Sequence, residues 1–277
     1  MKPAQFNYHD PASVAEVIDL LAEHGDEAAI LAGGQSLVPL LNLRLARPES
    51  VIDLRLVDEL RTFRSDDSGV TVGATVTASE LMNRPERRRC GAGLGEAIAL
   101  IGHPQIRNRT TIGGTVAHAD PASEMPAVLL ALDGAVTATS KSGGDRRIAA
   151  ADLFDGAYST TRRPDELITA VHLPAFDGVS TTVEIARRPG DFALVGAFVG
   201  LADGASRVCL FGVADRPIRV PEAEAAIDAE ATNADVSEAV RAAVDPRDDG
   251  HATGSYRRHV AGTIVARART ALAESSR

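Results

Sequence analysis

The stretch Ala28–Ser36 places two adjacent glycines directly after a short apolar run, and a second apolar segment follows from Leu37. Apolar runs of this length are typical of buried strands, and a Gly-Gly pair is a strong turn signal. Because glycine lacks a Cβ, a ligand can approach its main chain closely, and exposed N–H groups in such a turn can hold a phosphate. We therefore expect a strand, a tight glycine turn and then a helix or second buried segment.

A second Gly-Gly pair occurs in Thr110–Ala117, where Gly113 and Gly114 lie among apolar and β-branched residues. Two glycine turns flanked by hydroxyl or amide side chains can clamp both ends of one long phosphate-bearing ligand, and a dinucleotide has that length. The alternative is that both pairs are plain structural turns, so the pattern by itself supports a hypothesis of dinucleotide binding.

The order of the elements predicts a small βαβ unit with parallel strands, an antiparallel α+β unit and a final unit of sheet and helices. In the first unit we expect a helix from Asp10-Pro11 to His24, stopped by Gly25, and parallel strands over Ala28–Ala32 and Val51–Leu54. In the second we expect strands over Val70–Val76, Ala135–Thr139 and Leu167–Leu173, with Gly91–Gly95 as the approach to a helix. In the third we expect strands over Thr181–Ala186, Leu194–Ala202 and Val208–Val213, and helices over Glu222–Ile227, Val236–Val244 and Tyr256–Leu272.

Charge and cysteine content exclude several classes of function. The net charge of -9 argues against nucleic-acid binding. Only Cys90 and Cys209 are present, too few for the usual ligands of an iron–sulfur cluster or a cysteine-rich zinc site. The sequence has no apolar run long enough to span a membrane and no signal-peptide core near its N-terminus, so we expect a cytoplasmic location.

Three stretches carry a family resemblance: Ala32–Ser36, Thr111–Thr115 and Arg187–Ala193. In this order and spacing they resemble the signature stretches of the FAD-binding medium subunits of molybdenum hydroxylases, of the carbon monoxide dehydrogenase and xanthine dehydrogenase type. The resemblance runs nearly end to end and includes Tyr256–His259. It implies an α+β chain with a two-subdomain FAD-binding fold of the PCMH/vanillyl-alcohol-oxidase type, followed by a domain of three antiparallel strands and three helices. The expected limits are 1–57, 58–176 and 177–277.

The resemblance also implies which positions contact FAD. The first glycine stretch would wrap the pyrophosphate through main-chain N–H groups, and the second would form another phosphate-facing loop. Glu124 falls where the family has an acidic residue near the adenosine ribose, and Phe192 matches an aromatic position beside the isoalloxazine. The implied cofactor contacts are Ala29, Ile30, Leu31, Ala32, Gly33, Gly34, Gln35, Ser36, Ile101, Thr111, Ile112, Gly113, Gly114, Thr115, Glu124, Ile168 and Phe192.

By the same resemblance, the function would be electron relay. A large subunit would carry the molybdenum cofactor, a small subunit two [2Fe–2S] clusters, and the FAD of this chain would reduce an external acceptor. The family often forms a dimer of heterotrimers. It often carries a lysine before the Arg187-Arg188 pair, whereas Val183, Glu184 and Ile185 occupy that stretch here. No residue of this chain is expected to be catalytic or to bind a metal.

Two other hypotheses for the function of the chain stay open at this point. A stand-alone FAD oxidoreductase of the same fold would need a proton donor near the flavin, and His118 or Ser36 are the candidates. His118 and Asp120 are two residues apart, and in a strand they would share a face, as a catalytic or metal pair would require. The other reading is a non-enzymatic assembly subunit. The substrate of the complex and its electron acceptor cannot be read from this chain.

Overall fold

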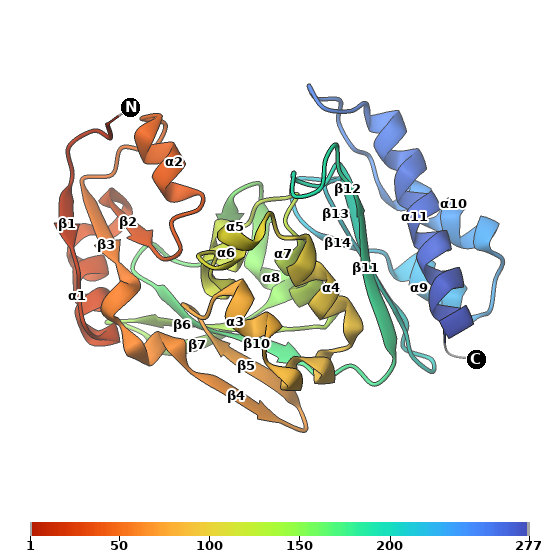
Figure 1. Cartoon of the computed structure of the whole chain (residues 1–277), viewed down its shortest axis with the longest axis horizontal. Coiled ribbons are helices and arrows are strands. Elements are labelled where there is room, and N and C mark those ends of the chain that lie inside the picture. The colour runs from red at the N-terminus through yellow and green to blue at the C-terminus, as the bar shows by residue number, and fades with distance from the viewer. Residues whose placement is uncertain (1, 276–277) are drawn as a thin grey trace.

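The computed structural model describes residues 2–275 and arranges them as three successive units along one long axis (Figure 1). The N-terminal unit contains a three-stranded sheet of order β1-β3-β2, and the middle unit a five-stranded sheet of order β4-β5-β10-β6-β7. The C-terminal unit contains a four-stranded sheet of order β11-β12-β13-β14. The expected α+β architecture is therefore confirmed, whereas the domain limits 1–57, 58–176 and 177–277 stay a prediction.

The N-terminal sheet is parallel, as the sequence predicted for its second and third strands. The central strand β3 pairs in parallel with β1 on one side and with β2 on the other. A connection that includes helix α2 links β2 to β3, which makes the expected βαβ unit. The elements are β1 Asn7–His9, α1 Val14–His24, η1 Gly25–Glu27, β2 Ala28–Leu31, α2 Leu37–Asn42, β3 Ser50–Asp53 and η2 Leu54–Leu56.

The start of helix α1 differs from the prediction. The helix begins at Val14, because the Ser13 hydroxyl accepts a hydrogen bond from the Glu16 N–H at 3.2 Å and acts as the N-cap. Asp10 and Pro11 lie before the helix and do not cap it. Gly25 ends the helix as predicted, with φ of 52°.

The five strands of the middle sheet are antiparallel throughout. They are β4 Phe63–Asp66, β5 Gly69–Gly73, β6 Ala135–Ser140, β7 Gly144–Ala149 and β10 Leu167–Pro174. The helices are η3 Asp58–Arg61, α3 Ala78–Met82, η4 Pro85–Cys90, α4 Ala92–Leu100, α5 Pro104–Arg107, α6 Ile112–His118, α7 Glu124–Ala131 and α8 Ala150–Leu153, with a small hairpin of β8 Phe154–Gly156 and β9 Ser159–Thr160.

The C-terminal sheet has a fourth strand in addition to the three that the sequence predicted. The two-residue strand β14 pairs with β13 and joins the sheet at its edge. Three helices follow as expected. The elements are β11 Val179–Ile185, β12 Val195–Leu201, β13 Arg207–Phe211, β14 Ile218–Arg219, α9 Pro221–Asp228, α10 Asn233–Ala243 and α11 Gly254–Ser275.

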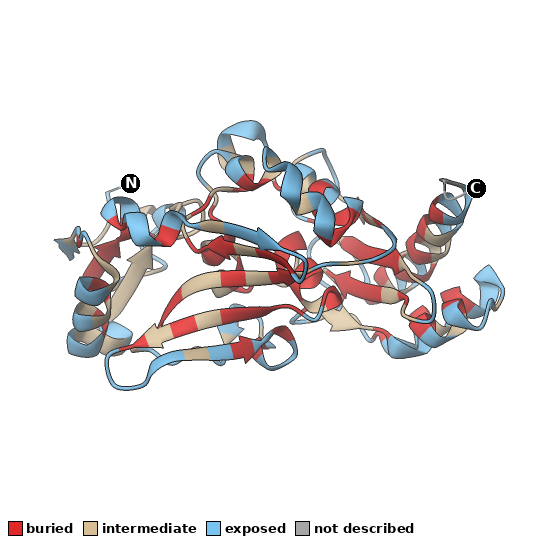
Figure 2. Ribbon diagram, turned by 90° about the horizontal axis from the view of Figure 1, so that it is seen from below, coloured by how far each residue is buried: buried red, intermediate tan, exposed pale blue. Residues whose placement is uncertain are grey.

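This sheet is covered on both faces. Helices α9, α10 and α11 lie on its outer face, and α4 and α7 of the middle unit pack on its inner face (Figure 1). Because side chains alternate along a strand, Val195, Ala197 and Val199 of β12 join the outer apolar cluster, whereas Phe198 joins the inner one. Figure 2 shows the buried residues that result along these strands.

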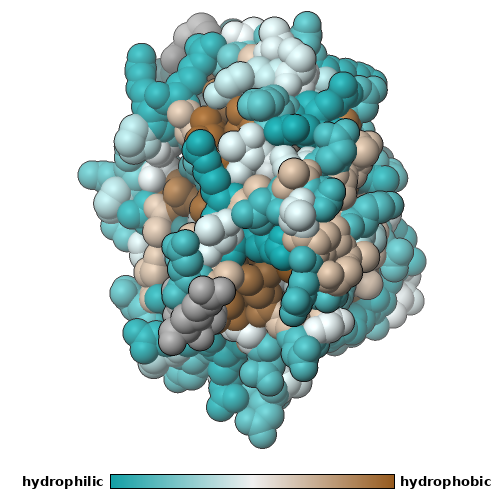
Figure 3. All heavy atoms as spheres, turned by 90° about the vertical axis from the view of Figure 1, so that its right-hand side faces the viewer, coloured by the Kyte–Doolittle hydropathy of each residue, from teal (hydrophilic) through white to brown (hydrophobic). Residues whose placement is uncertain are grey.

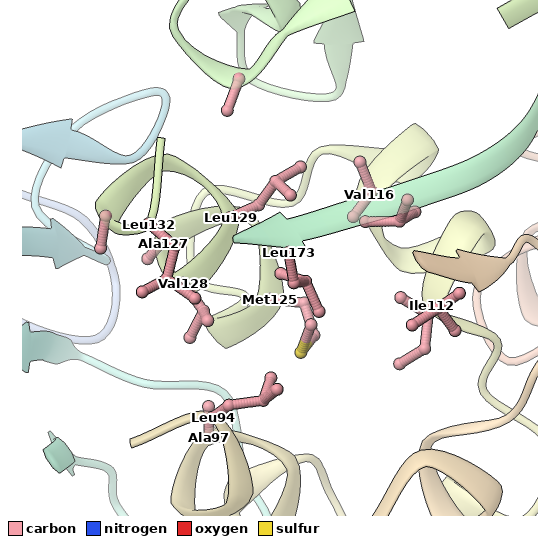
Figure 4. Packing of buried hydrophobic residues seen from close by; sticks show 14 of the residues in the cluster. Leu94, Ala97, Ile112, Val116, Met125, Ala127, Val128, Leu129, Leu132 and Leu173 are labelled. Carbon is pink, nitrogen blue, oxygen red and sulfur yellow. The ribbon is translucent and has the colours of Figure 1, made fainter. Parts of the chain in front are cut away.

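The inner cluster runs without interruption from the middle unit into the C-terminal sheet. Its residues include Leu94 of α4, Met125 and Leu129 of α7, and Leu173 of β10, which point toward one another in Figure 4. By contrast, the outer face at the C-terminal end is largely hydrophilic, with apolar atoms in a few recesses (Figure 3). None of the helices described between residues 2 and 275 combines the length and apolar content needed to cross a membrane.

Candidate functional site

A cavity of about 650 Å³ lies where the N-terminal and middle units meet, and residues 190–192 of the C-terminal unit form part of its wall. Both glycine stretches line it, so the two sequence motifs come together in space. Of the positions implied by the family resemblance, the cavity is lined by Ala29, Ile30, Ala32, Gly33, Gly34, Gln35, Ser36, Ile101, Thr111, Gly113, Gly114, Thr115, Glu124, Ile168 and Phe192.

Two of the expected positions do not line this cavity. Ile112 is fully buried and packs in the inner apolar cluster at the start of α6 (Figure 4). Leu31 ends strand β2, and its Cδ1 lies 3.3 Å from the point where a Cβ on Gly34 would be. Both residues therefore pack beside the glycine stretches and do not line the cavity.

The first glycine stretch is a tight turn, as predicted, and it leaves its donors free. Gly34 has φ of 75°, a conformation that favours glycine. Among the described residues, no group accepts a hydrogen bond from the main-chain N–H of residues 33 to 37. Five consecutive N–H groups without a protein partner, in the wall of a cavity, form a concentrated set of donors for an anion.

The second glycine stretch is not a turn, and this part of the prediction was wrong. Gly113 and Gly114 lie in the first turn of helix α6, which Thr111 caps by accepting the Gly114 N–H at 3.2 Å. The N–H of Gly113 donates to the Ala74 carbonyl at 3.0 Å. Because the N–H groups of Ile112 and Thr115 also donate to protein carbonyls, this stretch contributes shape and hydroxyl groups rather than free main-chain donors.

The glycines bring the two stretches against each other. A Cβ on Gly33 would lie 2.0 Å from the Arg109 carbonyl oxygen, just before the second stretch. A Cβ on Gly114 would lie 3.5 Å from the Cβ of Ala32. Real Cβ atoms cannot approach a carbonyl as closely as 2.0 Å, so the absence of a side chain at Gly33 permits this junction.

Glu124 contributes a buried acid to the same wall. It begins helix α7, and only 7% of its surface is exposed. Burial is the main cause that raises the pKa of its carboxyl group to about 8, and the nearby charges of Glu184 and Asp120 contribute to this shift. Near pH 7 the ligand-free chain therefore holds this carboxyl group mainly in its neutral form.

Apolar residues form other parts of the wall. Ile101 ends helix α4, and Ile168 lies in strand β10, and both are largely buried. Phe192 is 69% exposed although it lines the cavity, so its ring stands at the boundary between cavity and solvent.

Several lining residues carried no signal in the sequence. Asp26 lies in the three-residue helix η1, and Ser123, Arg162 and Pro164 lie in loops or at helix ends, where periodicity gives no information. The Arg162 guanidinium is held by the carbonyl oxygens of Arg163 and Glu166 at 2.7 and 2.6 Å. Only the folded structure shows that these residues line the cavity.

His118 and Asp120 both line the cavity, but they do not form the strand pair considered from the sequence. His118 ends helix α6, and Ala119 after it adopts a left-handed conformation. Asp120 instead accepts hydrogen bonds from the Ala122 N–H at 2.9 Å and the Tyr158 hydroxyl at 3.4 Å. Within residues 2–275, no group of three or more His, Cys, Asp or Glu side chains is placed to hold a metal ion.

Two models of known protein families together match almost the whole chain. Residues 4–176 match the family model described as "FAD binding domain in molybdopterin dehydrogenase", and residues 181–272 match "CO dehydrogenase flavoprotein C-terminal domain". The 6-hydroxypseudooxynicotine dehydrogenase complex subunit alpha of Paenarthrobacter nicotinovorans is 40% identical over 96% of this chain and 94% of that protein. The carbon monoxide dehydrogenase medium chain of Hydrogenophaga pseudoflava is 35% identical over 97% of each chain.

Solved structures agree with this assignment. The structure of quinoline 2-oxidoreductase from Pseudomonas putida 86 superposes with a TM-score of 0.92 at 35% identity and covers 99% of each chain. Carbon monoxide dehydrogenase from Hydrogenophaga pseudoflava superposes with a TM-score of 0.91 over 98% of each chain. The chain therefore belongs to the family of FAD-carrying medium subunits of molybdenum hydroxylases.

Proposed function

We propose that the cavity between the two glycine stretches binds FAD, with the diphosphate against residues 33–37. The observation that carries this proposal is the set of five main-chain N–H groups without a protein partner. The cavity volume of about 650 Å³ lies within the range of cofactor sites. The Thr115 hydroxyl, on the facing wall, supplies a further donor toward the same space.

The rest of the wall suits the two ends of such a cofactor. Glu124 and Ser123 offer hydrogen-bonding groups for the hydroxyls of a ribose, as expected for Glu124 from the resemblance. Ile101 and Ile168 offer apolar contact for a planar ring. Phe192, at the solvent boundary, would shield one face of the isoalloxazine and would move aside when an acceptor approaches.

When bound, FAD supplies redox chemistry that joins two-electron and one-electron carriers. The chain itself would hold the cofactor and shield it from water within the cavity. We propose that electrons arrive from the iron–sulfur clusters of a small subunit, which a large subunit with a molybdenum cofactor reduces, and leave to a quinone, NAD or dioxygen. A dimer of heterotrimers and a cytoplasmic location are part of this proposal.

The two other hypotheses, a stand-alone oxidoreductase and an assembly subunit, are less well supported. The named relatives are subunits or chains of larger dehydrogenases, which favours a relay subunit over a stand-alone enzyme. A pure assembly subunit would have no need for the free donors of residues 33–37.

Titration of the flavin-free chain with FAD and riboflavin tests the proposal. We expect FAD to bind in stoichiometric amount and riboflavin, which has no phosphate, to bind at least tenfold more weakly, because the N–H groups bind the diphosphate through charge-assisted hydrogen bonds. Quenching of flavin fluorescence measures both affinities.

A pair of glycine variants tests whether FAD binds at the proposed position. Gly114→Val adds a branched side chain beside Thr111 and Ala32 and should abolish FAD binding. Gly250→Val is the matched control, since nothing lies within 4 Å of its Cβ position. Equal affinity for FAD and riboflavin, or full FAD binding by a folded Gly114→Val chain, would refute the proposed site.

A further inference from the structure

A second cavity, of about 410 Å³, lies next to the glycine stretches and shares Ala32, Gly33 and Thr111 with the first cavity. Nothing in the proposed binding of FAD uses the remainder of its wall. That remainder is strongly polar and comes from the segment after β3, the turn between β5 and α3, and the segment before α6. It consists of Leu54, Arg55, Arg61, Thr75, Thr77, Ser79, Glu80, Asn83, Asn108 and Arg109.

The charge in this cavity is positive, although the chain as a whole carries a net charge of -9. Arg55 is already neutralised, because it lies 3.7 Å from Asp53 and 3.5 Å from Asp10. Arg61 and Arg109 form no ion pair or side-chain hydrogen bond with any other residue that the structure describes. Arg61 and Arg109 are exposed residues of this wall, and guanidinium groups that have no carboxylate partner among the described residues are suited to bind an anion.

Glu80, the carboxylate in the wall, forms no ion pair with Arg61 or Arg109. Its Oε2 accepts the N–H of Thr77 at 2.7 Å, and the Thr77 hydroxyl accepts the N–H of Glu80 at 3.1 Å. This reciprocal pair is the capping box of helix α3, which ties the acid to the helix start.

Neutral donors are also unused in this cavity. The Thr75 hydroxyl oxygen is buried and has no hydrogen-bond partner among residues 2–275, an arrangement that costs free energy unless a ligand or water completes it. Asn108 accepts the Ser79 hydroxyl through its Oδ1 at 2.7 Å, which leaves its Nδ2 group to donate. Guanidinium, hydroxyl and amide donors in one cavity match the acceptor-only surface of a phosphate group.

We propose that this second cavity binds an oxyanion of the phosphate class, held by Arg61 and Arg109 with Thr75 and Asn108 as neutral donors. The anion is either free phosphate or the phosphate group of a small ester, for which the volume of about 410 Å³ leaves room. The site is separate from the proposed flavin diphosphate site, from which the shared wall of Ala32, Gly33 and Thr111 divides it.

Equilibrium dialysis of the full chain against radiolabelled inorganic phosphate, at constant ionic strength, tests this site. We expect saturable binding that weakens roughly tenfold or more in Arg61→Gln and in Arg109→Gln, because each loses a charge-assisted contact. Thr75→Val, which replaces a hydroxyl by a methyl group, should weaken binding by a smaller factor. Arg64→Gln is the control, since Arg64 lies in β4 and lines neither cavity.

A second arm identifies the source of the phosphate group. Competition by glycerol 3-phosphate at lower concentration than inorganic phosphate assigns a phosphate ester, and the reverse order assigns the free ion. Absence of saturable binding, or equal binding by all four variants and the unmodified chain, would overturn the proposal.

Dialysis with and without FAD separates this inference from the proposed function. Arginine-dependent binding in both forms supports a separate site. If the chain takes up no FAD, the proposed function fails, but the arginine variants still decide the phosphate site in the flavin-free chain. Arginine-dependent binding that FAD abolishes would instead overturn the separateness of the two sites.

Discussion

At the scale of single residues, the absence of a side chain acts in two different ways in the glycine stretches. At Gly34 it permits a positive φ in the tight turn whose N–H groups have no partner among the described residues. At Gly33 it permits contact with the Arg109 carbonyl, which joins two distant segments of the chain. The sequence placed these glycines at an expected binding site, but it could not distinguish their two roles. The role of Gly33 depends on Arg109, a partner 76 residues away (109 − 33).

Glu124 gives a prediction of pH dependence at the same scale. Its pKa is about 8 in the folded chain against an ordinary value of 4.5, so between these values the folded chain keeps a proton that the unfolded chain releases. The free energy of unfolding should therefore fall as pH rises through this window, by up to about 1.4 kcal/mol per pH unit from this group. Urea denaturation of the flavin-free chain at several pH values measures this slope.

The control for this prediction is a matched pair of neutral variants. Glu124→Gln should make the stability less dependent on pH between 4.5 and 8. Glu86→Gln changes an exposed acid in η4 and should leave the dependence unchanged. Partly buried Glu184, whose pKa is raised to about 7, contributes a slope of its own in both variants. Identical pH profiles for the two variants would show that Glu124 does not carry the buried proton.

At the scale of elements, the sequence predicted the strands well and one helix poorly. Alternating residues over Val70–Val76 and apolar runs such as Leu167–Leu173 indicated strands that the structure contains. Gly113 and Gly114 indicated a turn, because glycine is unfavourable inside a helix. The helix forms because Thr111 caps it and because Gly113 packs against Ala74, where a Cβ would lie 2.5 Å from the Ala74 Cβ. That contact is tertiary and has no local signal.

A comparison of two helix caps tests the role of α6. Thr111→Ala removes the acceptor for the Gly114 N–H, and Thr232→Ala removes the equivalent cap of α10 in the C-terminal unit. Each should lower the free energy of unfolding by about 1 kcal/mol. Only Thr111→Ala should also weaken FAD binding, because the first turn of α6 lines the cavity. Equal FAD affinity in both variants would contradict a role for this helix start in the site.

At the scale of the whole molecule, the middle and C-terminal units share one apolar cluster. Phe198 of β12 packs edge-on against Phe176 with ring centroids 6.4 Å apart, and its ring would lie 2.7 Å from a Cβ on Gly93 of α4. The glycines of Gly91–Gly95 lie in or next to α4, where Gly93 allows the helix to approach the C-terminal sheet. No local pattern predicts this contact, because its members are separated by about a hundred residues.

Two phenylalanines in the C-terminal unit test whether this shared cluster makes the units unfold together. Phe198→Ala should lower the free energy of unfolding by about 3–5 kcal/mol, because it opens a cavity between the units, and calorimetry should still show one transition for both. Phe192→Ala should change stability little, since that ring is 69% exposed at the cavity boundary. Separate transitions for the two units in the unmodified chain would contradict a common core. With a common core, the main chain of residues 190–192 stays next to the second glycine stretch, whereas the exposed Phe192 ring keeps room to move.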